Sequence, residues 1–321
     1  MAKAKVSLVL GGGGARGLAH IGVLKVLEKN HLPISFIVGT SMGALVGGVY
    51  AAGTGIELME KLALSVDWKF VTKMLAPSLP ISGFVDGERI RSYLREFLGN
   101  PYIEQLRTPF SSVATDLTTG DEVIHDSGPL VDAIMASIAI PGIFKPVVYQ
   151  NRYLVDGGLV NPLPVSVAHK LRADVIIAVN VTPVPSKVGK PKKGEGVFRL
   201  SKTISMLRER LLLQPQTFDW KQIDRNDPPT KGKGSVDSTS VDSVPPRLLQ
   251  TLMQSIAIVQ TRVQTFHLSQ WPPDVLISPV IGGFNWLDFH RAKEMIDSGE
   301  DAANTALSEI RLAIQRYIKK T

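Results

Sequence analysis

The 321-residue sequence contains no cysteine. Disulfide bridges, thiolate metal sites and cysteine nucleophiles are therefore all excluded, and covalent catalysis would have to use another type of residue. Serine is the candidate that remains.

Charged and aromatic residues are modest, at 20% and 7%, whereas hydrophobic residues make up 44%. This composition is typical of an ordinary globular chain, and it excludes wholesale disorder, collagen and a coiled coil. No repeat of fixed period is visible, which argues against a solenoid or a propeller. The length suits one large α/β domain, or one domain with an appendage.

Long hydrophobic runs of the kind that target or span a membrane are also scarce. The first apolar run, residues 6–10, is shorter than a signal-peptide core and follows Lys3 and Lys5, so we expect a cytoplasmic protein. Residues 30–56 carry no Lys, Arg, Asp or Glu and are long enough to cross a bilayer. They include six glycines and Pro33, which favours a strand, a tight turn and a buried helix instead.

The net charge of +7 is concentrated in residues 185–250, which hold 13 Lys and Arg against 7 Asp and Glu. Within this part, residues 185–196 and 226–246 are rich in Pro, Gly, Ser and Lys, as flexible loops are, and a short apolar piece lies between them. We predict a catalytic region at 6–183, a basic, partly flexible insertion at 184–246, and helices with a strand at 247–321 that complete or flank the catalytic domain.

The basic insertion suggests that the protein makes peripheral contact with the anionic inner face of the membrane. Lys and Arg near such a surface gain about 1 kcal/mol each, an attraction that salt screens. The alternative is a solvated insertion without a function, and a nucleic-acid partner is not expected.

Apolar patterns elsewhere alternate between strands and helices. We predict strands at residues 6–10, 36–38, 110–114, 153–155, 175–181 and 275–277. We predict helices at residues 18–27, 42–52, 130–138 and 165–171, a late helix carrying the stripe from Leu249 to Val263, and an amphipathic helix in which Ile90, Tyr93, Leu94 and Phe97 dock on a core. Alternation of this kind implies an α/β fold with a parallel-rich sheet covered on both faces.

A glycine-rich loop, GGGGARG at residues 11–17, comes directly after the first predicted strand and before a helix. Backbone amides in such a loop can converge on an anion. Gly12, Gly14 and Gly17 also satisfy G-x-G-x-x-G, but a dinucleotide site needs an acidic residue about 20 positions later. No Asp or Glu occurs between Glu28 and Glu57, and no Gly-Lys-Ser or Gly-Lys-Thr of a Walker A loop occurs anywhere.

Residues 39–43 read GTSMG, which is the G-x-S-x-G pattern. The pattern lies between an apolar strand and an apolar helix, as a nucleophile elbow requires, with Ser41 at the sharp turn and Gly39 and Gly43 relieving contacts on either side. The alternative is a glycine-rich helix start in which Ser41 is a simple N-cap. An elbow serine and an anion-binding loop are complementary halves of one acyl-transfer site.

The general base has two kinds of candidate. The sequence has six histidines, of which His267 and His290 follow the serine in the chain order of an α/β-hydrolase triad, although neither lies in a motif. Asp156 begins Asp-Gly-Gly immediately after a predicted strand, where α/β active sites gather. A plain Asp-Gly turn is the alternative for this residue.

Taken together, four motifs resemble those of the patatin-like phospholipases, particularly the bacterial proteins related to neuropathy target esterase. These motifs are GGGARG at 12–17, GTSMG at 39–43, ASIAIP at 136–141 and DGG at 156–158. The resemblance covers residues 6–183 and implies a three-layer α/β/α patatin-like fold with a parallel-rich central sheet.

The resemblance also implies roles for individual residues. Ser41 would be the nucleophile and Asp156 the base, and amides of Gly12, Gly13 and Gly14 would form the oxyanion hole. Supporting positions in the same motifs are Arg16, Gly17, Gly39, Gly43, Gly157 and Gly158. Arg16 would stabilise the glycine loop or attract a phosphate.

The implied activity is a serine acyl hydrolase that cleaves fatty-acyl esters, such as phospholipids or lysophospholipids, through an acyl-enzyme and without a metal or organic cofactor. A free aspartate has a pKa near 3.9 and is a poor base, so burial would have to raise the pKa of Asp156. Two alternatives stay open. One is a Ser-His-Asp esterase of soluble substrates, and the other is a non-catalytic lipid or protein adaptor.

Overall fold

A computed structural model describes residues 4–74, 85, 87–182 and 248–320. The basic insertion predicted at residues 184–246 lies outside the described residues. Among the helices of the described part, none is long and apolar enough to cross a membrane.

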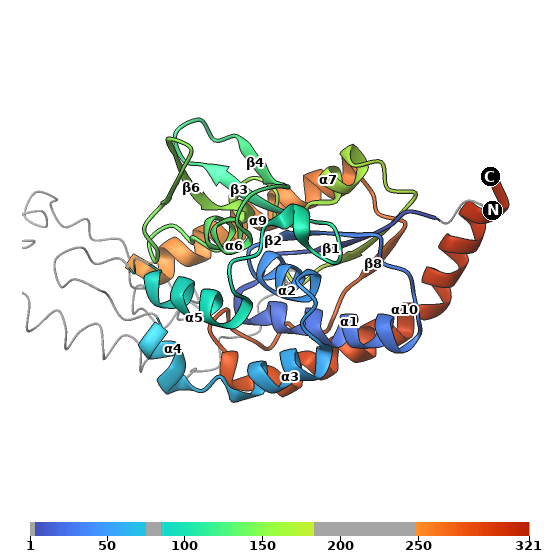
Figure 1. The fold of residues 1–321 in the computed structure, drawn as a ribbon, viewed down its shortest axis with the longest axis horizontal. Coiled ribbons are helices and arrows are strands. Elements are labelled where there is room, and N and C mark those ends of the chain that lie inside the picture. The colour runs from blue at the N-terminus through green and yellow to red at the C-terminus, as the bar shows by residue number, and fades with distance from the viewer. Residues whose placement is uncertain (1–3, 75–84, 86, 183–247, 321) are drawn as a thin grey trace, which may run out of the picture.

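The described strands form one mixed, mostly parallel sheet of eight strands (Figure 1). They are β1 (Val6–Leu10), β2 (Phe36–Thr40), β3 (Phe110–Asp116), β4 (Glu122–His125), β5 (Val147–Tyr149), β6 (Arg152–Asp156), β7 (Val175–Val179) and β8 (Val275–Ile277). Pairing connects them in the order β5-β6-β3-β2-β1-β7-β8, and β4 also pairs with β3. The pairings from β3 through β2, β1 and β7 to β8 are parallel, whereas those of β4, β5 and β6 are antiparallel.

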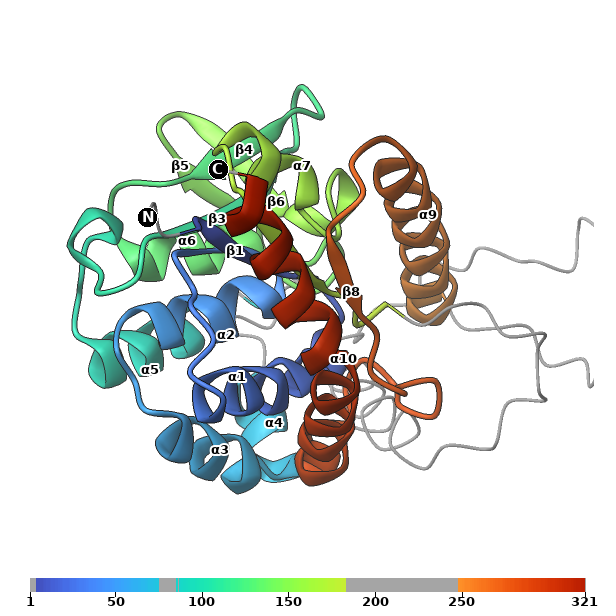
Figure 2. The same ribbon diagram turned by 90° about the vertical axis from the view of Figure 1, so that its right-hand side faces the viewer.

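Helices cover both faces of this sheet (Figure 2). One face carries α1 (Ala19–Lys29), α2 (Met42–Ala51), α3 (Ile56–Ser65), α6 (Leu130–Ser137) and α10 (Ala292–Lys320), with α4 (Trp68–Met74) and α5 (Glu88–Leu98) beside them. The other face carries α7 (Val165–Lys170) and α9 (Leu248–Gln270).

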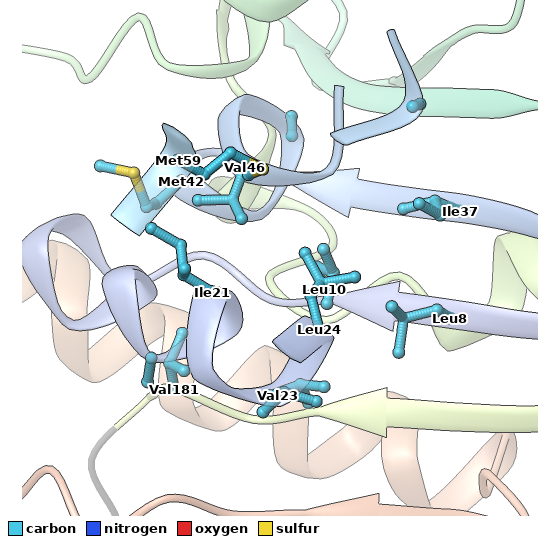
Figure 3. Packing of buried hydrophobic residues seen from close by; sticks show 14 of the residues in the cluster. Leu8, Leu10, Ile21, Val23, Leu24, Ile37, Met42, Val46, Met59 and Val181 are labelled. Carbon is cyan, nitrogen blue, oxygen red and sulfur yellow. The ribbon is translucent and has the colours of Figure 1, made fainter. Parts of the chain in front are cut away.

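The central strand β1 shows why the layers form. Leu8 and Leu10 point toward α1, where Leu24 packs on them (Figure 3), whereas Val9 points to the opposite face and packs with Val167 of α7. Side chains alternate along a strand, so a strand that is apolar at every position except Ser7 must be covered on both sides. The predicted three-layer α/β arrangement with a parallel-rich sheet is confirmed.

Every strand and helix for which residue ranges were predicted is present, with small differences in the ends. The strands at residues 6–10 and 275–277 match the prediction, and β2 continues two residues beyond the predicted end, to Thr40. The sequence patterns missed β4, β5, α3, α4 and the 29-residue α10. Helix α10 packs very closely on α1, and glycines at the contact make this possible. A β-carbon on Gly22 would collide with the carbonyl oxygen of Ile296, and one on Gly299 would collide with that of Ala19.

Candidate active site

Ser41 stands at a sharp turn between β2 and α2. Its backbone has φ 55° and ψ −121°, a conformation that side-chain-bearing residues rarely adopt. The carbonyl of Ser41 accepts hydrogen bonds from the amides of Ala44 and Leu45 and so begins the helix, but its hydroxyl makes no capping bond. The simple N-cap interpretation of this side chain is therefore wrong, and the hydroxyl is available for another partner.

The two glycines that flank Ser41 permit this turn by close packing. A β-carbon on Gly39 would lie 2.5 Å from the carbonyl oxygen of Gly43, and one on Gly43 would collide with the carbonyl oxygen of Leu10. A larger residue at position 39 would push β2 and α2 apart, and one at position 43 would push α2 away from the end of β1. This strand, sharp turn and helix are the geometry that a nucleophile elbow requires.

Asp156 is the partner of the Ser41 hydroxyl. Ser41 Oγ donates to Asp156 Oδ2 at 2.6 Å, and the amide of Gly158 donates to Asp156 Oδ1 at 2.7 Å. Both side chains are buried, with 7% of Ser41 and 3% of Asp156 exposed. The aspartate is therefore oriented through both of its oxygens, rather than standing in a plain Asp-Gly turn.

Strand pairing explains how two residues so far apart in the chain meet. Thr40, the last residue of β2, pairs with Val113 of β3, and Asp156 pairs with Ala114, the next residue along β3. Strand β4 occupies the opposite edge of β3 over the same residues, so β2 and β6 meet end to end on one edge. The residue that follows Thr40 is Ser41, which consequently faces Asp156.

Burial sets the acidity of the carboxyl group. It raises the pKa of Asp156 from an ordinary value of 3.8 to about 6, while the hydrogen bonds from Ser41 and Gly158 act in the opposite direction by stabilising the ionised form. Asp156 can thus hold or release a proton close to neutral pH.

The glycine loop lies directly beside Ser41. A β-carbon on Gly12 would be 3.1 Å from Ser41 Cβ, which is tighter than ordinary side-chain contacts. The amide of Gly12 already donates to the carbonyl of Pro162 at 2.9 Å. The amides of Gly13 and Gly14 have no hydrogen-bond acceptor among the described residues, so they are the two that an anion could engage.

Two contacts hold this loop in place. Arg16 Nε donates to the carbonyl of Gly13 at 3.1 Å, and the amide of Ala15 donates to the carbonyl of Trp286 at 2.8 Å. Burial lowers the pKa of Arg16 to about 10, and the nearby Asp288 opposes this shift, so Arg16 is a cation at neutral pH. Gly17, at the end of the motif, packs on Met42 so closely that a β-carbon would collide with it.

None of the six histidines, all of which lie in the described part, is hydrogen-bonded to Ser41 or Asp156. His267 Nδ1 lies 3.2 Å from Asn161 Oδ1, and the ring of His290 stacks against Trp68 at 5.1 Å between centroids. His20 Nε2 contacts the carbonyl of Gly11 at 2.8 Å, and complete burial lowers its pKa to about 4. The chain order that made His267 and His290 candidates does not bring them to the serine.

An apolar cavity of about 270 Å³ opens beside Ser41 and was missed by the sequence analysis. It is lined by side chains of α2, α3, α4 and α5 and contains no charged residue. The stripe of Ile90, Tyr93, Leu94 and Phe97, which predicted a helix docked on a core, lies along this cavity. Met42, Val46, Met59 and Ile21, which also line it, converge on the same side of the sheet (Figure 3). A helix facing a cavity and a helix facing a core carry the same apolar pattern, so the sequence offered no signal to distinguish them.

Comparison with known proteins gives a consistent result. Residues 8–169 match the family model described as patatin-like phospholipase. An uncharacterized NTE family protein of Mycobacterium tuberculosis is 33% identical over 331 residues, covering 94% of this chain and 91% of that protein. Neuropathy target esterase sws of Drosophila melanogaster is 34% identical over 183 residues, covering 55% of this chain and 13% of that protein. Among solved structures, VipD from Legionella pneumophila superposes with a TM-score of 0.52 at 13% identity, covering 95% of this chain and 67% of that one, which is a likeness of fold.

The raised pKa of Asp156 predicts how stability changes with pH. Between about pH 4 and pH 6 the native state keeps the proton that an unfolded chain, with a pKa near 3.9, releases. The native state therefore loses stability as the pH rises through this window, by roughly 3 kcal/mol for a pKa of about 6. Asp156→Asn removes the titration, so the variant should gain stability relative to the wild type as the pH rises.

Urea unfolding of both proteins at about pH 4.5 and about pH 7.5 measures this change. A stability difference that stays the same at the two pH values would contradict a raised pKa for Asp156.

Proposed function

The chain belongs to the patatin-like phospholipase family, a family of lipid hydrolases, and from this premise we propose that it cleaves fatty-acyl esters of phospholipids or lysophospholipids through a Ser41–Asp156 dyad. The observation that carries the proposal is the 2.6 Å hydrogen bond from Ser41 Oγ to Asp156 Oδ2, placed beside an apolar cavity.

The proposed reaction has two halves. Ser41 Oγ attacks the ester carbonyl carbon while its proton passes to Asp156 Oδ2, which gives a tetrahedral intermediate. The intermediate collapses to an acyl-enzyme, and Asp156 returns the proton to the departing alcohol. A water molecule then loses a proton to Asp156, attacks the acyl carbon and releases the fatty acid, after which the proton goes back to Ser41.

In the proposed reaction, the glycine loop stabilises the negative charge that develops on the ester oxygen. The amides of Gly13 and Gly14 are the proposed donors, because the amide of Gly12 is engaged by Pro162. In other enzymes the removal of one such donor costs about 3 kcal/mol of transition-state stabilisation. Gly12 contributes by its lack of a side chain, which lets the loop approach Ser41, and Arg16 by its bond to the carbonyl of Gly13.

Asp156 can serve as the base because its burial raises the pKa of the carboxyl group. A general base works best when its pKa lies near the operating pH, and burial raises the pKa of Asp156 to about 6. The proposed acylation step needs the ionised carboxylate, so its rate should increase as the pH rises through this value.

The apolar cavity supports the proposal that the enzyme recognises the acyl chain of its substrate. Its lining carries no charge, and each methylene that leaves water for such a surface contributes about 0.8 kcal/mol. Polar, soluble esters would gain little from this surface. The cavity therefore favours fatty-acyl substrates over the soluble esters of the alternative hypothesis.

The exposed face of α9 supports contact with an anionic lipid surface. Four apolar side chains on this helix are exposed, namely Leu252, Ile258, Val259 and Phe266, the last at 63%. The helix contains no Asp or Glu, and Arg262 is exposed among them. Interfacial helices bury apolar side chains at the boundary of the bilayer, and Lys or Arg adds attraction to anionic lipids. In Figure 2, α9 stands on the outer side of its layer, where such a surface could be reached.

The position of α9 also relates this face to the cavity. Leu252, near the start of the helix, packs against Gly142, where a β-carbon would lie 2.5 Å from Leu252 Cδ2. Gly142 stands between Ile140 and Phe144, which line the cavity. The start of α9 thus lies next to the segment that lines one end of the cavity, although the helix itself covers the opposite face of the sheet.

Substitutions in the dyad should abolish turnover without unfolding the protein. Ser41→Ala removes the nucleophile and Asp156→Asn removes the base, so we expect a loss of at least about 1,000-fold in kcat for a fatty-acyl ester. His267→Ala and His290→Ala, the matched controls for a triad, should keep most of the activity. Steady-state hydrolysis and circular dichroism of the purified variants provide the measurement.

Two outcomes would contradict the dyad. Hydrolysis by Ser41→Ala, with contaminating esterases excluded, would show that the nucleophile lies elsewhere. Loss of turnover in a folded His267→Ala or His290→Ala variant would favour a Ser-His-Asp esterase.

The double variant Val259→Ser, Phe266→Ser should bind anionic vesicles more weakly than the wild type, because it removes exposed apolar area from α9. We expect sedimentation with phosphatidylglycerol-containing vesicles to fall by about 10-fold, and wild-type binding to decrease with salt. Leu312→Ser on α10, a helix elsewhere on the surface, is the matched control, since Leu312 is also exposed.

Equal vesicle binding by the double variant and the wild type would reject this lipid-binding face. A change in oligomeric state by analytical ultracentrifugation, with vesicle binding unchanged, would instead assign the face to contact between copies of the chain.

A further inference from the structure

The ASIAIP motif at residues 136–141 lends Ile140 to the cavity and has no part in the chemical steps described above, yet its backbone and Ser137 contact both members of the dyad. Ser137, the last residue of α6, accepts a hydrogen bond at Oγ from the amide of Ser41 at 2.9 Å. Two residues later, the carbonyl of Ala139 accepts a hydrogen bond from the amide of Asp156, also at 2.9 Å. One short segment thus holds the backbone of the nucleophile and the backbone of the base.

The orientation of the Ser137 hydroxyl is fixed. Ser137 Oγ donates its proton to the carbonyl of Val113 at 2.6 Å, so only its lone pairs remain to face the amide of Ser41. The side chain is completely buried, and water cannot replace either partner. The hydroxyl links strand β3 to the elbow.

Val113 contacts the base side of the site as well. A β-carbon on Gly157, the residue that follows Asp156, would collide with the carbonyl oxygen of Val113. The same oxygen therefore locates both the turn after Asp156 and, through Ser137, the turn at Ser41.

Such anchoring is needed because the conformation of Ser41 is strained. A residue with a side chain at φ 55° persists only where the surrounding structure fixes it. On the carbonyl side, Ser41 is fixed by the start of α2. On the amide side, the described residues offer one hydrogen-bond acceptor, Ser137 Oγ.

We propose that Ser137 is a positioning residue, which holds the strained turn at Ser41 so that Oγ faces Asp156 Oδ2. Together with the carbonyl of Ala139, it sets the distance between nucleophile and base. This inference rests on the proposed function of Ser41 and Asp156 as a dyad. It also explains the ASIAIP motif, because Ser137 and Ala139 are spaced so that they contact the backbone of Ser41 and of Asp156 at the same time.

A matched control separates positioning from ordinary structural support. Ser112 of β3 is also completely buried, and its hydroxyl donates to the carbonyl of Ala133 at 3.3 Å. It makes no hydrogen bond to Ser41 or Asp156 among the described contacts. Replacement of either serine by alanine removes one buried hydroxyl, but only one of the two touches the elbow.

The experiment compares Ser137→Ala with Ser112→Ala in the full chain. The reactivity of Ser41 is measured as the second-order rate of labelling by a fluorophosphonate, and kcat and KM are measured for a short p-nitrophenyl ester. We expect Ser137→Ala to lower the labelling rate and kcat by about 10- to 100-fold with KM nearly unchanged, since small misplacements of reacting groups have effects of this size. Ser112→Ala should stay within about two-fold of the wild type in labelling rate and kcat, although the loss of its buried hydroxyl lowers its Tm.

Two results would overturn the positioning role of Ser137, and a third would overturn the proposed function. Labelling of Ser137→Ala at the wild-type rate, with a lowered Tm, would overturn the proposal and leave Ser137 as a structural serine. An equal loss of labelling in Ser112→Ala would also overturn it, because the effect would then follow from any buried hydroxyl. If Ser41→Ala is still labelled, the proposed function itself fails, whatever Ser137→Ala does.

A second variant covers the case in which Ser137→Ala does not fold. Ser137→Cys replaces the hydroxyl with a slightly larger thiol, which still fills the site but is a weaker acceptor. It should label more slowly than the wild type by about 3-fold or more, and labelling at the wild-type rate would contradict the positioning role.

Discussion

The site depends on one constraint of strand pairing: β2 and β6 use the same edge of β3, one after the other. Because Thr40 pairs with Val113 and Asp156 pairs with Ala114, the chain that leaves β2 must turn next to Asp156. The sharp turn at Ser41, with glycines on both sides, is the local solution to this constraint. The 2.6 Å hydrogen bond between the two side chains is its result.

Burial of the carboxylate suits the proposed chemistry and also opposes stability. Desolvation raises the pKa of Asp156 toward neutrality, which improves it as a base, but an ionised buried carboxylate is costly to the fold. The hydrogen bonds from Ser41 and from the amide of Gly158 offset part of that cost. The apolar cavity beside Ser41 belongs to the same arrangement, since under the proposed function it would receive the acyl chain next to the hydrogen-bonded pair.

Sequence patterns predicted the parts of this protein that are encoded locally. The motifs around Ser41 and Asp156 identified two residues that the structure brings together, and continuous apolar runs predicted the central strands. The antiparallel strands β4 and β5 escaped prediction, and neither is fully buried, so neither needs the continuous apolar run that marks a central strand. The partner of the Gly12 amide, the carbonyl of Pro162, is about 150 residues away and is set by tertiary packing that no local pattern records. The cavity was missed for the same reason, since the stripe on α5 describes an apolar face without saying whether atoms or space lie opposite.

The central claim is that Ser41 is a nucleophile activated by Asp156. The most direct test treats the protein with a fluorophosphonate and maps the adduct by tandem mass spectrometry of the tryptic peptide spanning residues 30–61, which contains Ser41. The account predicts one adduct, located on Ser41, that forms much more slowly in Asp156→Asn. An adduct on another residue, or labelling of Ser41 at the same rate in Asp156→Asn, would contradict it.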